Sequence, residues 1–204
     1  MKLYYAPASC SFAAHVALRE AGIPFEPVKV DLRKHTLANG ADYYAINPKG
    51  YVPLLELDDG ERLSELAVIL QYIADRKPGT LAPAFGTLER YRLMEWLHFI
   101  ATEVHKQFGP LWYADTPEAT KDKQRATLAK RLGHIAKTLE RQPYLMGDSF
   151  TVADAYLHAM LNWTGFLKVD LSPWPALQEY QKRIAERPAV LEAHRVEHGA
   201  KQAA

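Results

Sequence analysis

The chain has very little cysteine, since Cys10 is the only one among its 204 residues. A single cysteine cannot form a disulfide within the chain, which fits a protein of a reducing compartment. A redox cycle between two cysteines of the same chain is excluded for the same reason. Exchange between Cys10 and an external thiol stays possible.

Long apolar runs and an excess of one charge are also missing. No apolar run reaches the roughly 18 residues that a membrane-spanning helix needs, and the first residues lack the apolar core of a signal peptide. Lys and Arg total 25 against 24 for Asp and Glu, so no net charge favours nucleic acid or a membrane surface. We expect a cytoplasmic protein that binds neither.

The first part of the chain alternates strand-like and helical patterns. A β-prone run at residues 2–5, a helical stripe from Cys10 to Gly22 and a strand-like run at 25–32 predict a βαβ unit with parallel strands. The Asp-Gly turn after residue 58 separates two short strand-like runs and predicts a hairpin. With a short helical piece at 41–46 and a helix at 65–76, the predicted order is β-α-β-α-β-β-α.

Breaker residues then mark a linker, and the remaining pattern is helical. Residues 77–86 are rich in Pro and Gly, and no strand is predicted beyond them. Helical stripes cover residues 87–112, 117–141, 151–166 and 175–187, and a short helix follows Pro188. The sequence therefore predicts an α/β domain at 1–76, a linker at 77–86 and an all-helical domain at 87–204.

The segment from Asn47 to Leu57 is the one around which the chain is organised. A turn runs into Pro53, and proline in a sheet belongs at an edge or at the first residue of a strand. We expect an edge strand that leaves the N–H and C=O of Val52 unpaired. Glu65 then opens a helix whose first N–H groups favour anions. The two features suit a small charged peptide, although an ordinary loop into an edge strand explains the segment equally well.

Cys10 lies where a loop passes into a helix, with Ser9 as the expected N-cap. Helix N–H groups at that position stabilise a thiolate, so we expect the pKa of Cys10 to lie below that of a free thiol. The alternative is a small buried side chain without chemistry.

Two histidines and one capping sequence complete the candidates. His98 and His105 are seven residues apart, which separates their backbones by roughly 10 Å along a helix and argues against one shared metal ion. No other cluster has metal-ligand spacing, and we expect no metal. Thr151 to Asp154 resembles a capping box, which is a folding feature.

Together these pieces resemble a cytosolic glutathione transferase over essentially the whole chain. The most telling motifs are Asn47–Pro53, Ser64-Glu65 and Gly147–Asp154, while Tyr5–Ser11 and Glu103–Lys106 resemble the bacterial beta class. The resemblance implies a thioredoxin-like first domain followed by an all-α domain. It also implies a homodimer that uses glutathione as co-substrate, without a cofactor, in the detoxification of small hydrophobic electrophiles.

The resemblance also assigns roles to single residues. Cys10 and His105 flank the glutathione sulfur as catalytic residues, and a cis Pro53 lets Val52 pair with the cysteinyl backbone of glutathione. Glu65 and the N–H of Leu66 hold the γ-glutamyl group. The other implied glutathione contacts are His35, His98 and Lys106.

Three of these positions depart from the family pattern. Leu66 stands where many members have serine, and His98 where close relatives have an asparagine that reaches the neighbouring subunit's site. His35 stands where lysine often contacts the glycine carboxylate, so the charge of that contact depends on pH. We chose candidates for the electrophile pocket by apolar surface and place in the chain: Tyr5, Ala6, Trp112, Tyr113, Trp163 and Phe166.

Three functions are compatible with the sequence. The leading hypothesis is an enzyme that activates glutathione and adds it to small electrophiles. The second is glutathione-dependent thiol–disulfide exchange through Cys10. The third is a non-catalytic protein that binds glutathione or apolar ligands. Conjugation and disulfide-reduction assays separate the three, and the sequence does not identify the second substrate.

Overall fold

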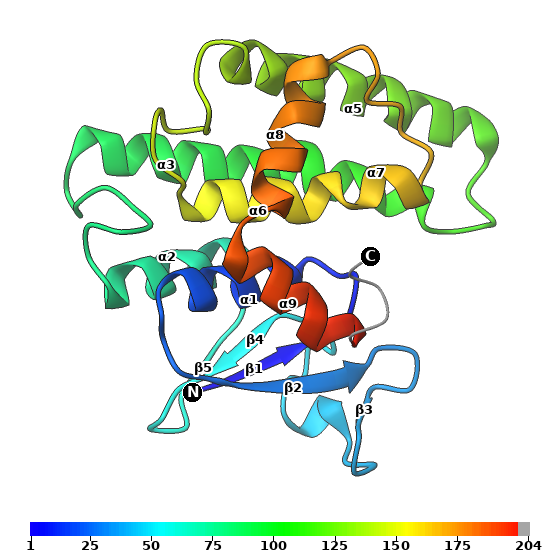
Figure 1. The fold of residues 1–204 in the computed structure, drawn as a ribbon. Helices are drawn as coiled ribbons and strands as arrows, with labels where there is room; N and C mark the ends of the chain where they lie inside the picture. Colours follow the sequence, from blue (N-terminus) through cyan, green and yellow to red (C-terminus); the bar gives the residue numbers. More distant parts are fainter. Residues whose placement is uncertain (200–204) are drawn as a thin grey trace. The chain divides into compact units, whose positions relative to one another are not determined.

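A computed structural model describes residues 1–199 of the chain (Figure 1). The chain divides into two compact units. The first comprises Met1–Leu81 together with the described residues from Arg187 onward, and the second is Ala82–Glu186. None of the described helices is long and apolar enough to cross a membrane.

A five-stranded sheet forms the centre of the first unit. Its strands are β1 (Lys2–Tyr5), β2 (Glu26–Asp31), β3 (Thr36–Leu37), β4 (Leu54–Glu56) and β5 (Arg62–Leu63), in the order β3-β2-β1-β4-β5. The parallel pairing of β1 with β2 and the β4–β5 hairpin confirm two predictions. The two-residue strand β3 was not predicted, because so short a run carries no alternation.

The predicted edge strand after Pro53 is wrong. β4 pairs with β1 on one side and with β5 on the other, so β5 is the edge. The turn after Leu57 folds the chain back along the outer side of β4, with the Leu57 N–H bonded to the Glu61 carbonyl. Val52 precedes this pairing and stays outside the ladder.

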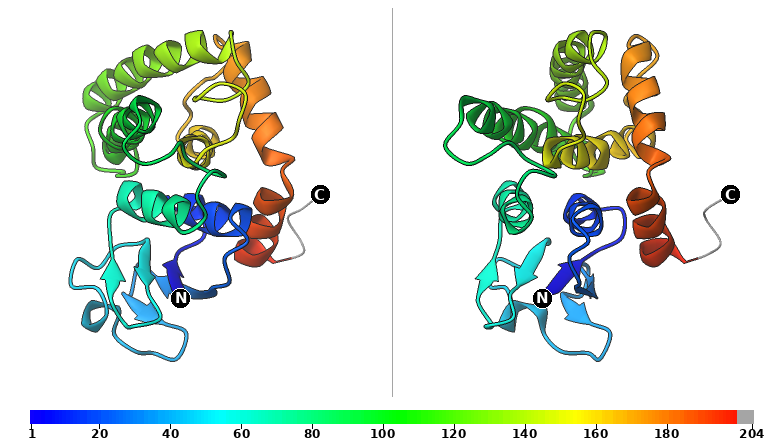
Figure 2. Two further views of the ribbon diagram at one scale, coloured as in Figure 1. Left: turned by 90° about the vertical axis from the view of Figure 1, so that its left-hand side faces the viewer. Right: turned by 60° about the vertical axis from the view of Figure 1, so that its left-hand side comes forward.

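Helices cover one face of the sheet. Figure 2 shows α1 (Ser11–Glu20) and α2 (Leu66–Arg76) together on one face, with α9 (Pro188–His198) beside α1. The short piece predicted at 41–46 is a 3-10 turn, η1 (Tyr43–Ala45). Its Tyr43 is fully buried and packs with Tyr4, Val30, Val52 and Leu54. Val52 is thus held by the core of the unit.

The terminal helix differs from the expected assignment. The helix after Pro188 was predicted to belong to the helical domain at 87–204, yet α9 belongs to the first unit and packs on α1. The contact includes a hydrogen bond of 2.8 Å between the buried side chains of His15 and Glu197. Such a long-range contact leaves no local signal in the sequence.

The second unit is helical. Its elements are α3 (Leu88–Phe99), η2 (Ile100–His105), α4 (Lys106–Phe108), η3 (Gly109–Leu111), α5 (Glu118–Leu139), α6 (Val152–Leu161), α7 (Trp163–Phe166) and α8 (Pro175–Ala185). The single helix predicted at 87–112 is interrupted, since η2 has π-helical hydrogen bonding. The helix predicted at 151–166 is divided at Asn162.

Candidate functional site

Val52 presents a peptide group outside the sheet. The Val52–Pro53 bond is cis, as the family resemblance implied. The Val52 carbonyl accepts a hydrogen bond from the Cys10 thiol, with Sγ at 3.6 Å. Among residues 1–199 no acceptor bonds to the Val52 N–H. This segment therefore offers a free backbone donor beside a thiol.

Cys10 lies near its expected position, but with the opposite effect on its thiol. Cys10 itself is the N-cap of α1, and the side chain of Ser9 instead accepts a bond of 3.2 Å from the Ser11 N–H. Loss of water around the sulfur raises the pKa of Cys10 to about 12, and the charge of Glu65 adds to this. A backbone hydrogen bond acts in the other direction but is weaker. The expected lowering of the pKa is therefore wrong, because desolvation exceeds the effect of the helix N-terminus.

Glu65 is the N-cap of α2 and has an unusual backbone, with φ at 68°. Its carboxylate is exposed, and one oxygen accepts bonds from Lys49 Nζ at 2.9 Å and Tyr51 Oη at 2.7 Å. The Lys49 ammonium, followed by the Tyr51 hydroxyl, holds the pKa of Glu65 below its ordinary value. Lys49 and Tyr51 were not predicted as partners of Glu65, although both lie between Asn47 and Leu57.

His35 reaches the same loop. Its Nδ1 bonds to the Gly50 carbonyl at 3.0 Å, and because a carbonyl only accepts, this nitrogen carries a proton. The ring lies against Tyr44, with centroids 4.5 Å apart. Gly50 has φ at 73° and the Tyr44 ring lies where a Cβ would stand, so a glycine is required there. The loop of residues 47–52 thus contains Val52 and both partners of Glu65, and His35 bonds to it through the Gly50 carbonyl.

In the second unit, His105 ends the π segment η2. Its Nδ1 lies 2.8 Å from the Tyr156 hydroxyl on α6, a partner that the sequence analysis missed. Burial, with a smaller contribution from the Lys106 charge, lowers the pKa of His105 to about 4. The imidazole is therefore neutral at physiological pH.

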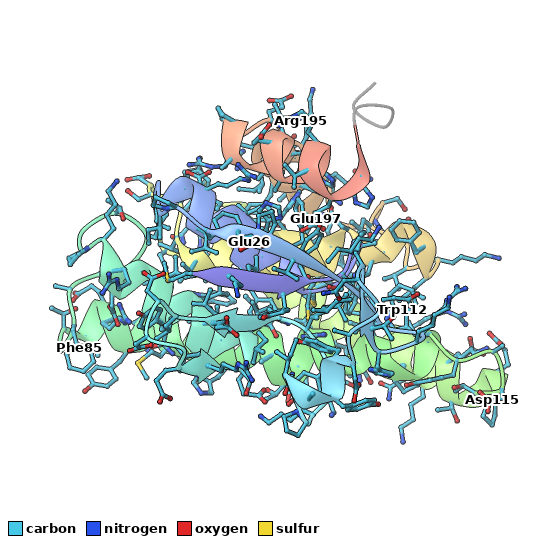
Figure 3. The ribbon with its side chains drawn as sticks, turned by 90° about the horizontal axis from the view of Figure 1, so that it is seen from below. Glu26, Phe85, Trp112, Asp115, Arg195 and Glu197 are labelled. Carbon is cyan, nitrogen blue, oxygen red and sulfur yellow. The ribbon has the colours of Figure 1, made fainter. Side chains whose placement is uncertain are left out.

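Aromatic rings surround His105. The Trp163 ring lies 5.0 Å from the His105 ring and 5.3 Å from that of Trp112, between centroids. Of the residues predicted for the electrophile pocket, Trp163 therefore lies beside the predicted catalytic histidine, and Trp112 packs against Trp163. The labelled Trp112 in Figure 3 is partly exposed, as an open binding surface requires.

The remaining predicted residues have less defined surroundings. Tyr113 and Phe166 are 65% and 68% exposed, whereas Tyr5 and Ala6 are buried in the first unit. His98 is exposed, and its Nδ1 bonds to the carbonyl of Met94 in the same helix. Lys106 is exposed as well. No hydrogen bond or ring contact in the described residues joins any two of these six side chains.

Two family models match the chain. Glutathione S-transferase, N-terminal domain, matches residues 8–76, and Glutathione S-transferase, C-terminal domain, matches residues 93–188. Glutathione S-transferase GstA of Escherichia coli O157:H7 is 47% identical over 195 residues, covering 95% of this chain and 96% of GstA. The disulfide-bond oxidoreductase YfcG of Escherichia coli K12 is 30% identical, covering 94% and 93% of the two chains.

Solved structures agree with these matches. A ternary complex of BphK, a bacterial glutathione transferase, superimposes with a TM-score of 0.95 at 51% identity, covering 97% of this chain and 99% of BphK. A beta-class enzyme from Sphingomonas chungbukensis has a TM-score of 0.93 at 44% identity, covering 98% and 100%. A sphingomonad enzyme complexed with glutathione has the same score and identity, covering 97% and 98%. The chain belongs to the glutathione S-transferase family and is similar to its bacterial beta class.

Proposed function

We propose that the protein is a glutathione transferase, which activates the thiol of glutathione for attack on small hydrophobic electrophiles. The observation that carries the proposal is a pair of groups in the first unit, the unpaired N–H of Val52 and the carboxylate of Glu65. These groups match a peptide backbone and an ammonium group. The likeness to a sphingomonad enzyme complexed with glutathione supports the same ligand.

Each group has a defined task in this proposal. The N–H and C=O of Val52 pair with the cysteinyl peptide, and the Glu65 carboxylate accepts from the γ-glutamyl ammonium. The N–H of Leu66, at the first turn of α2, donates to the γ-glutamyl carboxylate. His35 bonds to the glycine carboxylate, with Lys106 and His98 as further contacts.

In the reaction, the bound thiol loses its proton and the resulting thiolate forms a carbon–sulfur bond with the electrophile. The Cys10 thiol is protonated at neutral pH. When glutathione binds, this proton turns from the Val52 carbonyl to the glutathione sulfur, which leaves the carbonyl to the cysteinyl N–H of the ligand. The neutral His105 imidazole, oriented by Tyr156, accepts the proton from the glutathione thiol. Trp112, which packs on the buried Trp163, provides the apolar surface for the electrophile.

Thiol–disulfide exchange through Cys10 is a second candidate, favoured by the likeness to a disulfide-bond oxidoreductase. The raised pKa of Cys10 argues against it, because the thiolate is the attacking species. A conjugation assay beside a disulfide-reduction assay separates the two. A chain that binds glutathione without either activity would instead be a binding protein.

Replacing Glu65 tests the assignment of the glutathione site. A hydrogen bond to a charged group contributes about 1.5–3 kcal/mol, so Glu65→Ala should weaken glutathione binding roughly 10- to 100-fold. Calorimetric titration measures the dissociation constant. Glu61→Ala, a change at an exposed glutamate four residues earlier, is the matched control. Wild-type affinity in Glu65→Ala would remove Glu65 from the site.

We also infer a cytoplasmic homodimer. Phe85, labelled in Figure 3, is 83% exposed, and Leu88 and Tyr91 near the start of α3 are exposed too. Large apolar side chains that lie together on a surface are typical of an interface. Sedimentation at micromolar concentration should give twice the 23.1 kDa of the chain, and Phe85→Ser should shift the equilibrium toward the monomer. A monomer in the wild-type protein would contradict the inference.

A further inference from the structure

The turn that carries Lys49 and Tyr51 holds one oxygen of the Glu65 carboxylate. Lys49 Nζ and the Tyr51 hydroxyl both donate to Oε1, at 2.9 and 2.7 Å. Among residues 1–199 no donor bonds to Oε2. The two oxygens of the carboxylate are therefore not equivalent: one is engaged and the other is available to a ligand.

The turn itself is fixed by buried groups. The Tyr51 carbonyl accepts from Asn47 Nδ2 at 2.7 Å and from the Tyr43 hydroxyl at 3.1 Å. Asn47 Oδ1 in turn accepts from the Lys49 N–H at 3.2 Å. Asn47 and Tyr43 are almost entirely buried, so the backbone of Lys49 and Tyr51 has little freedom.

The side chains on this turn also restrain each other. Lys49 Nζ lies 5.6 Å from the centroid of the Tyr51 ring and also donates to the Ser64 hydroxyl at 2.9 Å. Ser64 directly precedes Glu65 in the chain. Lys49 therefore joins the turn to the start of α2 at two points, and Tyr51 joins it at a third.

We propose that Tyr51, assisted by Lys49, is a positioning residue that presents Glu65 Oε2 to the ammonium group of the ligand. This inference rests on the proposed function. An exposed glutamate samples several rotamers and loses that freedom when it binds a ligand. Because Tyr51 and Lys49 restrict the carboxylate beforehand, less freedom is lost on binding. Tyr51 does not touch the reacting sulfur and affects binding rather than the chemical step.

The role predicts a change in affinity without a change in turnover. Tyr51→Phe keeps the ring and removes only the hydroxyl, so the dissociation constant of glutathione should rise about 3- to 10-fold, the range of one neutral hydrogen-bond donor. At saturating glutathione kcat should stay within about 2-fold. Lys49→Met should weaken binding as well. Tyr72→Phe, a change of the same kind within α2, is the control and should leave both quantities unchanged.

A double-mutant cycle distinguishes positioning from a general structural effect. In a Glu65→Gln background, Tyr51→Phe should change the dissociation constant far less than in the wild type, because the charged acceptor is gone. An equal loss of affinity in both backgrounds would overturn the inference, and so would unchanged affinity in Tyr51→Phe and Lys49→Met. In either case, glutathione binding by the wild type would leave the proposed function intact. A wild-type protein that binds no glutathione would overturn the proposed function itself. Thermal melts of each variant show whether it is folded.

Discussion

Cys10 shows how two effects compete at one residue. Its place at the N-terminus of α1 favours a thiolate, while loss of water around the sulfur favours the thiol and raises the pKa to about 12. We expect the ligand-free protein to react with iodoacetamide at pH 8 about 100-fold or more slowly than free cysteine, whose pKa is about 8.5. Intact-mass spectrometry follows the reaction over time.

Two controls accompany this measurement. Cys10→Ala should gain no label, and the protein unfolded in urea should react at the rate of free cysteine. An alkylation profile of the folded protein with its midpoint below pH 8.5 would show that the helix N-terminus dominates after all. Slow alkylation together with the absence of disulfide-reduction activity would exclude Cys10 as the attacking thiol of a disulfide exchange.

The candidate site was predictable where chemistry follows the chain locally. Val52 outside the strand pairing and Glu65 at the N-cap of α2 agree with the turn and helix-start signals of their segment, whereas the expected edge position of the strand after Pro53 is wrong. The bond from His105 to Tyr156 joins residues 51 positions apart, and no local pattern indicates it. The predicted lowering of the Cys10 pKa was wrong, because the burial of the sulfur depends on the whole surrounding fold.

Among the elements, α6 has the most strongly specified beginning. The buried Asp154 carboxylate accepts from the N–H and the hydroxyl of Thr151, the N–H of Leu145 and the hydroxyl of Tyr180, at 2.8–3.0 Å. These bonds confirm the predicted capping box and extend it to two further segments of the second unit. Burial raises the pKa of this carboxyl, and the four donors oppose that effect.

Removal of the carboxylate should therefore destabilise the second unit. Asp154→Ala leaves buried donors without an acceptor, and we expect the free energy of unfolding to fall by roughly 3–5 kcal/mol. Tyr180→Phe removes a single donor and should cost about 1 kcal/mol. Urea denaturation measures both. A loss below that of Tyr180→Phe would mean that water replaces the carboxylate.

The elements were predicted where they are long or bounded by turn residues. The βαβ unit, the hairpin and the separate helices of the second half follow from periodicity and from Gly and Pro positions. The π segment η2 and the division at Asn162 hardly change the spacing of the apolar residues. Periodicity in the sequence therefore predicts neither of them. The interior position of β4 depends on which strands pair, which no single strand specifies.

At the scale of the whole molecule, the chain returns to its first unit at the end. α9 packs on α1, and Figure 3 shows Glu197 on the side of α9 that faces the unit, with Arg195 pointing away. His15 and Glu197 are fully buried and 182 residues apart in sequence. Burial raises the pKa of Glu197 to about 8 and lowers that of His15 to about 3. Both shifts favour the neutral forms of the two groups, in which the carboxylic acid donates to Nδ1.

This pair makes the stability of the first unit depend on pH. Glu197 ionises near pH 4.5 in the unfolded chain but near 8 in the fold, so its contribution is lost as the pH rises between these values. His15 acts in the opposite direction and loses its contribution as the pH falls from 6.5 toward 3. Arg19 lowers the pKa of both groups, and Glu192 raises that of His15, but burial exceeds either charge.

Glu197→Gln should remove the alkaline part of this dependence. The amide is neutral at every pH and can still donate to His15 Nδ1, so the variant should gain thermal stability relative to the wild type between pH 5 and pH 8. One unit of pKa difference corresponds to about 1.4 kcal/mol, so the gain should be measurable in melting temperatures at pH 5, 6.5 and 8. Glu192→Gln, on the exposed side of α9, is the control and should show no such gain, because ionisation of Glu192 is favoured in the fold. If the wild type instead became more stable than Glu197→Gln as the pH rises, the buried pair would be ionised. A salt bridge would then join α9 to α1.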